Sequence, residues 1–220
     1  MPSIAAHPSL TGLDGSTPPS LRPVLQPLPA LTSAGTRLLD AASELFYDRG
    51  VRAVGVDLIA ETAGTTKKTL YDRFGSKDAL VALYLLRRAH RWRAHLLAHL
   101  AEAGDVAPVL VVFDVLEDWM GGQRRGCAFV NAYAELGGVG PGREEHPAVP
   151  VVRSEKAWMR ALFDELTGDA TLGGHVHLVY EGTLVLLTAG GDPGVSATAR
   201  AVVAGLVERR GDRDRPARGR

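Results

Sequence analysis

Apolar residues recur at helical spacing through most of this 220-residue chain. The first such stripe, which Gly50 ends, holds Leu38, Leu39, Ala42, Leu45 and Phe46. Further stripes predict helices over about 80–103, 159–168, 171–189 and 195–209. The valine-rich stretch 109–113 continues at helical spacing to Trp119, so we interpret it as helix and not strand. Because no alternating segment is joined to a hairpin-type turn, we predict an all-α fold.

The composition of the chain limits which ligands it can bind and where in the cell it is expected. The chain has 25 basic and 25 acidic residues, so any nucleic acid would have to be bound by a local patch. A single cysteine, Cys127, excludes an internal disulfide and a zinc site made only of cysteines. The longest uncharged apolar stretch near the C-terminus, 182–191, is shorter than the roughly 20 residues of a membrane span. With no secretory signal at its start, the chain is expected to be cytoplasmic.

The two ends of the chain differ in composition from the stretch between them. Residues 1–34 contain 7 of the 13 prolines, and each proline removes a backbone donor, so we predict a disordered leader there. Residues 208–220 hold six arginines against three carboxylates. We predict a disordered Arg-rich tail over 211–220, either solvated or making an additional DNA contact.

The most informative stretch runs from Val56 to Phe74. Two short helical segments, 56–63 and 65–74, are joined at Gly64, which is the pattern of a helix-turn-helix. In each segment two apolar residues lie four apart and give it an apolar face: Ile59 with Ala63, and Leu70 with Phe74. Small Ala60 allows close helix packing, and Thr65 or Thr66 offers an N-cap hydroxyl for the second helix.

The other face of the second segment is rich in hydrogen-bond donors. It comprises Thr65, Thr66, Lys67, Lys68, Thr69, Tyr71 and Arg73, and Lys77 follows shortly after. Donors near a helix N-terminus suit phosphates and the acceptor-rich major groove, so we predict that these residues bind double-stranded DNA. The alternative is a solvated helix face. Seven basic and seven acidic residues balance between 35 and 78, so only their distribution could create a basic surface.

The run IAETAGTTKKTLYDRFGSKDAL at residues 59–80 resembles the DNA-binding signature of TetR/AcrR-type transcriptional regulators. The resemblance implies about nine helices, with a DNA-binding domain over 35–80 and a ligand-binding and dimerisation domain over 81–210. It further implies that Thr65, Thr66, Lys67 and Thr69 begin the recognition helix, while Tyr71 and Lys77 contact phosphates. Lys68 and Arg73 complete the predicted DNA-binding set.

Two features depart from the family pattern. Where relatives have a capping Ser or Thr before the first segment, this chain has Gly55, which has no hydroxyl to offer a phosphate. Arg37 is the nearest basic residue to the start of the first helix, so a basic arm reaching the minor groove is not expected.

By the same resemblance, the chain acts as a homodimeric repressor that binds a palindromic operator and is released by a small molecule. The last two predicted helices are apolar enough to need a partner surface, although burial in an intramolecular core would also explain them.

The predicted ligand-binding residues are Trp119, Phe129, Asn131, Tyr133, Trp158, Phe163 and Tyr180, and plain core packing is the alternative for each aromatic among them. Asn131 and Glu135, one turn apart, could face the pocket or a neighbouring helix.

Two other classes of function compete with this interpretation. One is an enzyme with Cys127 as nucleophile and His175 or His177 as base, but no catalytic motif frames these residues, and a core cysteine fits better. The other is a helical interaction module without salt-sensitive DNA affinity. His95 and His99 could share a metal, but the positive charge of four nearby arginines opposes a bound cation. We expect these arginines to lie on a solvated helix face: Arg87, Arg88, Arg91 and Arg93. We therefore predict no catalytic residue, metal or cofactor.

Overall fold

The computed structural model describes residues 28–137, 144–192 and 194–213. Within these residues the chain is helical and contains no strand, which confirms the all-α prediction. The α-helices are α2 (Ser33–Arg49), α3 (Val56–Thr62), α4 (Lys67–Phe74), α5 (Lys77–Ala101), α6 (Pro108–Gly121), α7 (Ala128–Leu136), α8 (Ala148–Thr167), α9 (Ala170–Val185) and α10 (Val195–Arg213). A π-helical turn, Leu186–Gly190, extends α9.

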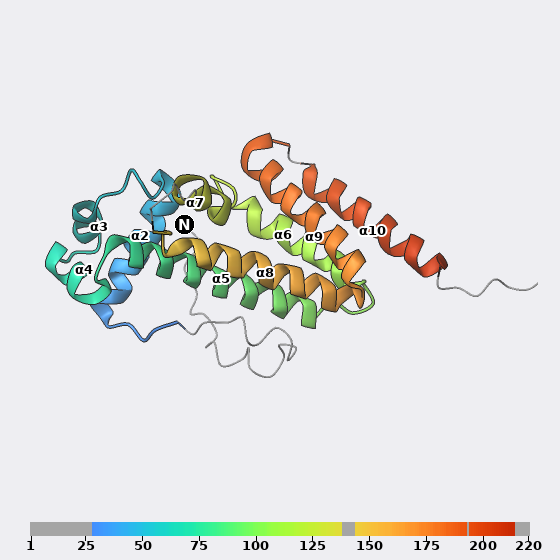
Figure 1. The fold of residues 1–220 in the computed structure, drawn as a ribbon, viewed down its shortest axis with the longest axis horizontal. Coiled ribbons are helices and arrows are strands. Elements are labelled where there is room, and N and C mark those ends of the chain that lie inside the picture. Colours follow the sequence, from blue (N-terminus) through green and yellow to red (C-terminus); the bar gives the residue numbers. More distant parts are fainter. Residues whose placement is uncertain (1–27, 138–143, 193, 214–220) are drawn as a thin grey trace, which may run out of the picture.

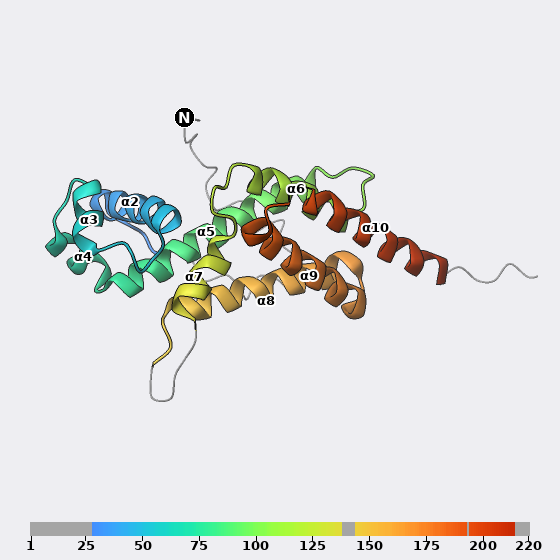
Figure 2. The ribbon, with the colours of Figure 1, turned by 90° about the horizontal axis from the view of Figure 1, so that it is seen from above.

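Three helices, two of them short, form a group at one end of the elongated molecule (Figure 1). Helices α2, α3 and α4 cluster there, and the long α5 leads from them into the larger helical body (Figure 1). Viewed from above, α5 runs from this group into the body, where it packs against α8 and α6 (Figure 2). We call α2–α4 with the start of α5 the reading head, and the remainder the body.

Local sequence signals explain where α2 begins and ends. The Thr32 side chain accepts a hydrogen bond from the backbone N–H of Gly35 at 3.3 Å and caps the helix. All five residues of the predicted apolar stripe are buried. Gly50, at φ 89°, ends the helix in a conformation that disfavours a residue with a Cβ. The first predicted helix is confirmed.

The core of the body is built from aromatic rings on three helices. Tyr180 of α9 lies with its ring centroid 5.4 Å from Phe163 and 6.4 Å from Phe113. Trp158 of α8 is completely buried, and its ring lies 4.9 Å from the guanidinium carbon of Arg93. The valine-rich stretch that could have been a strand is the buried part of helix α6, as the spacing indicated.

Three boundaries differ from the sequence-based expectation. Helix α2 begins at Ser33, inside the predicted leader and two residues before the predicted start of the DNA-binding domain at 35, and residues 1–27 lie outside the described part. Helix α5 begins at Lys77, so the expected domain boundary at residue 80 falls inside a continuous helix. The C-terminal helix continues to Arg213, into the predicted disordered tail, whose residues 214–220 are not described.

The predicted solvated arginine face is wrong for Arg87, whose side chain is 12% exposed and pairs with Asp40, and also for Arg93. The Arg93 side chain is 2% exposed and donates to the Glu155 carboxylate through Nε at 2.8 Å and Nη2 at 2.7 Å. Burial lowers the pKa of Arg93, and the Glu155 charge opposes that shift. The residue lies on α5 where α8 packs against it, so its partner is 62 residues away in the chain and invisible to a helical-period argument. No helix in the described residues is both long and apolar enough for a membrane crossing.

Candidate nucleic-acid interface

The helix-turn-helix is held together by small and apolar side chains. Ile59 of α3 and Leu70 of α4 are completely buried, and Ala60 is nearly so, as the spacing predicted. Gly64 takes the left-handed turn at φ 60°. Arg37 of α2 donates from Nε to the Ala63 carbonyl oxygen at 3.2 Å, which ties the turn to the first helix. These contacts fix the direction in which α4 points.

Helix α4 has a hydroxyl cap at its N-terminus. The Thr66 Oγ1 accepts a hydrogen bond from the backbone N–H of Thr69 at 3.1 Å, and the two threonine hydroxyls lie 2.9 Å apart. Of the two candidate caps, Thr66 is therefore the cap and Thr65 is not. Gly75 ends the helix at φ 73°, and Ser76 caps α5 by accepting from the Ala79 N–H at 3.0 Å.

Helix α3 lacks such a cap. Its N-cap residue, Gly55, makes no side-chain hydrogen bond, which agrees with the predicted absence of a hydroxyl there. The carboxylate of Asp57 lies in the first turn, where it suits the positive end of the helix dipole.

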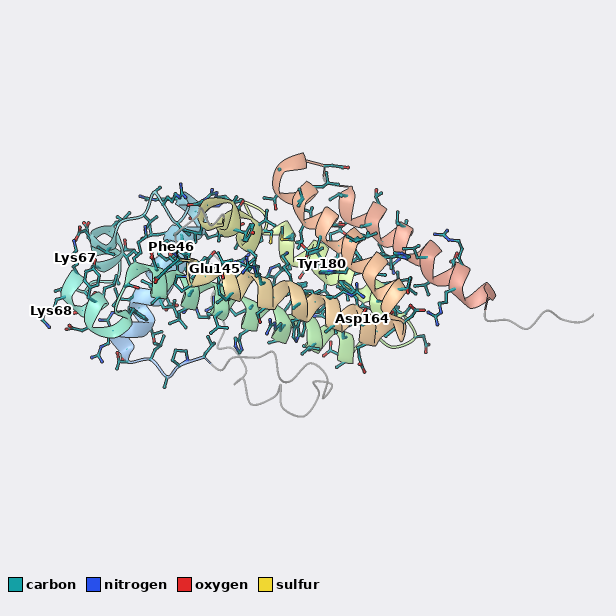
Figure 3. The ribbon with its side chains drawn as sticks, viewed as in Figure 1. Phe46, Lys67, Lys68, Glu145, Asp164 and Tyr180 are labelled. Carbon is teal, nitrogen blue, oxygen red and sulfur yellow. The ribbon has the colours of Figure 1, made fainter. Side chains whose placement is uncertain are left out.

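Most of the predicted DNA-binding side chains form one exposed face. Lys67 and Lys68 project from α4 at the outer end of the reading head (Figure 3). Tyr71 is 44% exposed. The exposed members are Thr66, Lys67, Lys68, Tyr71 and Arg73, and the half-buried ones are Thr65, Thr69 and Lys77. Thr65 differs from the rest because its hydroxyl is buried without a hydrogen-bond partner in the described structure, so it faces inward.

The cations of this face are not equivalent. Lys67 Nζ lies 3.2 Å from the Asp57 carboxylate, and Lys68 Nζ lies 2.6 Å from that of Asp72. Both pairs are solvent-exposed and therefore weak, so a phosphate could replace either carboxylate. Arg73 and Lys77 form no ion pair with any described residue. They are the two cations already free to bind an anion.

The reading head is joined to the body by hydrogen bonds that sequence reasoning did not identify. The Tyr47 hydroxyl of α2 donates to the Gly126 carbonyl oxygen at 3.1 Å and accepts from the Arg125 N–H at 2.9 Å. Nearby, Glu135 of α7 accepts from the backbone N–H of Arg52 at 2.8 Å. Glu135 thus faces the reading head, and together with Asn131 it lines a cavity of about 10 Å³ there. No local signal marks Tyr47, because both its partners are more than 70 residues away.

The body contains a small cavity lined by part of the predicted ligand set. It encloses about 30 Å³, which is room for about one water, and its wall includes Trp119, Phe129 and Tyr180. The side chain of Glu155, which the sequence analysis did not select, also lines it. Burial raises the pKa of Glu155, and the Arg93 charge opposes that shift.

The other four predicted ligand residues lie elsewhere. Asn131 donates from Nδ2 to the Arg125 carbonyl oxygen at 2.6 Å. Tyr133 is exposed on α7, while Trp158 and Phe163 belong to the core. The aromatic pattern of the sequence could not separate these positions, since each lies on an amphipathic helix.

Four of the five residues considered for an enzyme or a metal site, Cys127, His95, His99 and His177, have structural partners, and the fifth, His175, is exposed. Cys127 is buried, and its backbone N–H donates to the Thr188 hydroxyl at 2.9 Å. The rings of His95 and His99 lie 4.4 Å apart. Within the described ranges, no group of three or more His, Cys, Asp or Glu side chains could hold a metal ion.

Comparisons with known proteins agree with this geometry. Residues 38–84, which cover α2 to the first part of α5, match the family model described as "Bacterial regulatory proteins, tetR family". The HTH-type transcriptional activator FasR of Mycolicibacterium smegmatis is 33% identical over 144 residues, which are 63% of this chain and 61% of FasR. The HTH-type transcriptional repressor KstR2 of Rhodococcus jostii is 42% identical over 62 residues, 26% of this chain and 30% of KstR2.

The match to a solved structure covers more of the molecule. SCO4454, a TetR-family transcriptional regulator from Streptomyces coelicolor, is 30% identical, with a TM-score of 0.70 over 80% of this chain and 95% of that one. The chain spans less than two thirds of the curated relatives FasR and KstR2, whereas its likeness to SCO4454 extends through the body. The protein belongs to the TetR family of bacterial transcriptional regulators, which are DNA-binding proteins and not enzymes.

Proposed function

We propose that this regulator is a ligand-responsive repressor that binds a palindromic operator as a homodimer in the cytoplasm. Residues 35–80 would bind DNA, and residues 81–210 would bind the ligand and the second protomer. The observation that carries the proposal is the exposed, capped N-terminal half of α4, whose donors lie on one face of the reading head. A recognition helix of this kind enters the major groove with its N-terminal residues against the base edges.

The proposed DNA contacts follow from the exposure of each side chain. Thr66, Lys67 and Thr69 would reach bases and nearby phosphates from the start of α4. Lys68, Tyr71 and Arg73 continue that face, and Lys77 would bind a phosphate from the start of α5. Thr65 stays in the proposed set only if its turn opens on binding, since its hydroxyl now faces inward.

Exposed apolar side chains on α9 and α10 support a homodimer. Leu178 is 72% exposed, although it lies in the middle of α9. Val185, Leu186 and Val202 are each exposed by almost half. Helix α9 already buries its other face, so a second apolar face requires another covering surface. A twofold dimer would set its two reading heads on half-sites separated by about one helical turn or a multiple of it.

The cavity and the bonds around Tyr47 support a ligand response. At about 30 Å³ the cavity must enlarge to hold a ligand, because small-molecule sites measure roughly 300 to 1,000 Å³. Its wall includes Cys127 and Ala128, which immediately follow the segment that bonds to Tyr47. Movement of that wall would therefore reach α2. A coupling of about 1 to 3 kcal/mol, roughly 5- to 150-fold in affinity, suffices for a switch.

Whether the protein represses or activates transcription is proposed from the simplest way in which a DNA-bound dimer can act. FasR is named an activator and KstR2 a repressor, so both signs occur among the relatives. We propose repression because occupancy of an operator by two reading heads is enough to exclude other proteins from it. A transcription assay with the operator placed before a reporter would show a fall in transcript on adding the protein.

Selection of bound sequences from a random duplex pool tests the whole proposal. With the full chain at moderate salt, we expect a palindromic motif, and the DNA-binding stoichiometry should be at least two protomers per site. The recovered duplex then serves to screen small molecules for release. Failure to recover any motif, with only weak binding to all sequences, would contradict the proposed operator recognition.

A further inference from the structure

An open groove lies where the reading head meets the body. It measures about 560 Å³ and is bounded by α2, α5, α6 and the turn after α6. This volume falls within the range of small-molecule sites, whereas the inner cavity of about 30 Å³ does not. The groove is distinct from the DNA-binding face, since none of the proposed DNA contacts lines it.

The groove is lined by more positive than negative charge. Four arginines and two carboxylates contribute to its wall. Arg87 is already engaged, because it donates to Asp40 at 2.6 Å and to the Ser43 hydroxyl at 2.6 Å. Arg124 is paired with Asp48 at 3.0 Å. Arg91, one turn after Arg87 on the same helix, forms neither a hydrogen bond nor an ion pair with the described residues.

Arg88 is held beside Arg91 in a preorganised position. Its guanidinium carbon lies 5.0 Å from the centre of the Tyr47 ring and 5.7 Å from that of Trp119. Nη2 donates to the Gln123 side chain at 3.0 Å, which leaves other N–H donors of this guanidinium unused. Planar guanidinium groups bind carboxylates and phosphates through two parallel hydrogen bonds. The adjacent rings offer an apolar surface next to this donor group.

We propose that the groove binds a small organic anion, with its carboxylate or phosphate on Arg91 and Arg88 and its apolar part against Tyr47 and Trp119. Arg88 and Trp119 also line the inner cavity, so an apolar tail could extend there once Trp119 turns. The carboxylate of Glu155 in that cavity has one buried oxygen without a hydrogen-bond partner in the described structure. Arg93 already pairs with this carboxylate, so we place the charged end of the ligand in the groove, where Arg91 and Arg88 have unused donors.

A ligand bound in the groove would contact the reading head and could change its position. Tyr47 both lines the groove and makes the hydrogen bonds to Arg125 and Gly126. A bound molecule would touch α2 on one side and Trp119 of α6 on the other. Only this consequence for DNA rests on the proposed ligand response; the binding itself does not.

Three probes with the same chain length and different head charges test the inference on the full protein. Octanoate, octanol and octyltrimethylammonium are titrated at one ionic strength, with intrinsic tryptophan fluorescence and calorimetry as readouts. We expect octanoate to bind most tightly. Arg91→Gln should weaken octanoate about tenfold and leave octanol unchanged, in line with the loss of one charge-assisted hydrogen bond. Arg153→Gln, on the exposed side of α8, is the matched control and should have no effect.

The outcomes distinguish anion binding in the groove from the effect of that binding on operator affinity. Equal binding of the three probes, preference for the cation, or an Arg91→Gln variant that binds octanoate normally would overturn the anion site. Thermal unfolding of both arginine variants confirms that they are folded. If octanoate binds with the expected Arg91 dependence but leaves operator affinity unchanged, the anion site stands and its control of the reading head is rejected.

Discussion

Tyr47 and Gly126 join the reading head to the body through a hydrogen bond of 3.1 Å from the tyrosine hydroxyl to the glycine carbonyl oxygen. The same hydroxyl accepts from the Arg125 N–H, so one side chain satisfies two backbone groups of the segment before α7. That segment continues into Cys127, whose N–H is bound by Thr188 of the π-helical turn after α9. The chain of contacts runs from the DNA-binding unit to the end of the helix that we propose to form the dimer.

Removing the Tyr47 hydroxyl should therefore affect both the stability of the folded chain and the coupling between the reading head and the body. We expect Tyr47→Phe to lower the free energy of unfolding by about 1 to 2 kcal/mol, because two backbone groups lose their partner. Denaturant unfolding at fixed protein concentration measures this. Tyr71→Phe, on the exposed DNA-binding face, is the control and should unfold like the parent. Equal stability of the two variants would show that the Tyr47 bonds contribute nothing net.

Lys77 should contribute one phosphate contact. We expect Lys77→Ala to reduce the slope of log affinity against log salt by about one, with a similar loss of affinity for all sequences. Lys67→Ala should change the slope by less, because Lys67 leaves Asp57 to bind DNA. Binding titrations on the selected operator at several salt concentrations give both slopes. An unchanged slope for Lys77→Ala would remove it from the DNA-binding set.

The Thr66 hydroxyl caps α4, so its loss should destabilise the reading head. We expect Thr66→Ala to cost about 0.5 to 2 kcal/mol, whereas Thr66→Ser, which keeps the oxygen, should cost less. Both are measured by chemical unfolding. If Ser restores stability but not operator affinity, the threonine methyl contacts DNA; if Ala is as stable as the parent, the cap is unimportant.

Removing one partner of the buried pair of Arg93 and Glu155 should destabilise the protein strongly. We expect Glu155→Ala to destabilise by about 3 to 5 kcal/mol, since it leaves the Arg93 charge buried without its partner. Replacing both residues by Met and Leu should cost less than the single change. Unfolding of Arg93→Met, Glu155→Leu and the variant with both changes forms a double-mutant cycle. Additive losses would mean that the pair has no coupling energy.

Glu181 should make stability depend on pH in the acid range. Burial acts to raise its pKa, but the His177 ring nitrogen, 3.3 Å from the carboxylate, and the Lys156 ammonium, which donates to it at 2.6 Å, outweigh burial and lower the pKa from 4.5. The unfolded chain then binds more protons, so this contribution is present above about pH 4.5 and is lost as the pH falls through the lowered value. We expect Glu181→Gln to be less stable than the parent at pH 7 and to converge with it in acid. A constant difference from pH 7 to 3 would contradict this.

The sequence alone determined the reading head, because its signals are local. Capping hydroxyls, Gly64 in the turn and apolar residues four apart act within one or two helical turns, and they fixed α2, α3 and α4. The same local logic indicated which face of α4 is exposed. It could not reveal that the Thr65 hydroxyl turns inward, since this depends on how α3 and α4 pack.

Only the tertiary structure decided the roles of residues in the body. Helical period places Trp119 and Trp158 alike on apolar faces, yet one lines a cavity and a groove and the other is completely buried. It likewise could not separate the buried Arg93 from the exposed Arg91. The distinction arises from packing α5 against α8, which brings together residues about 60 positions apart. Local periodicity specifies which face of a helix is apolar, but the neighbour that covers it is chosen by the whole fold.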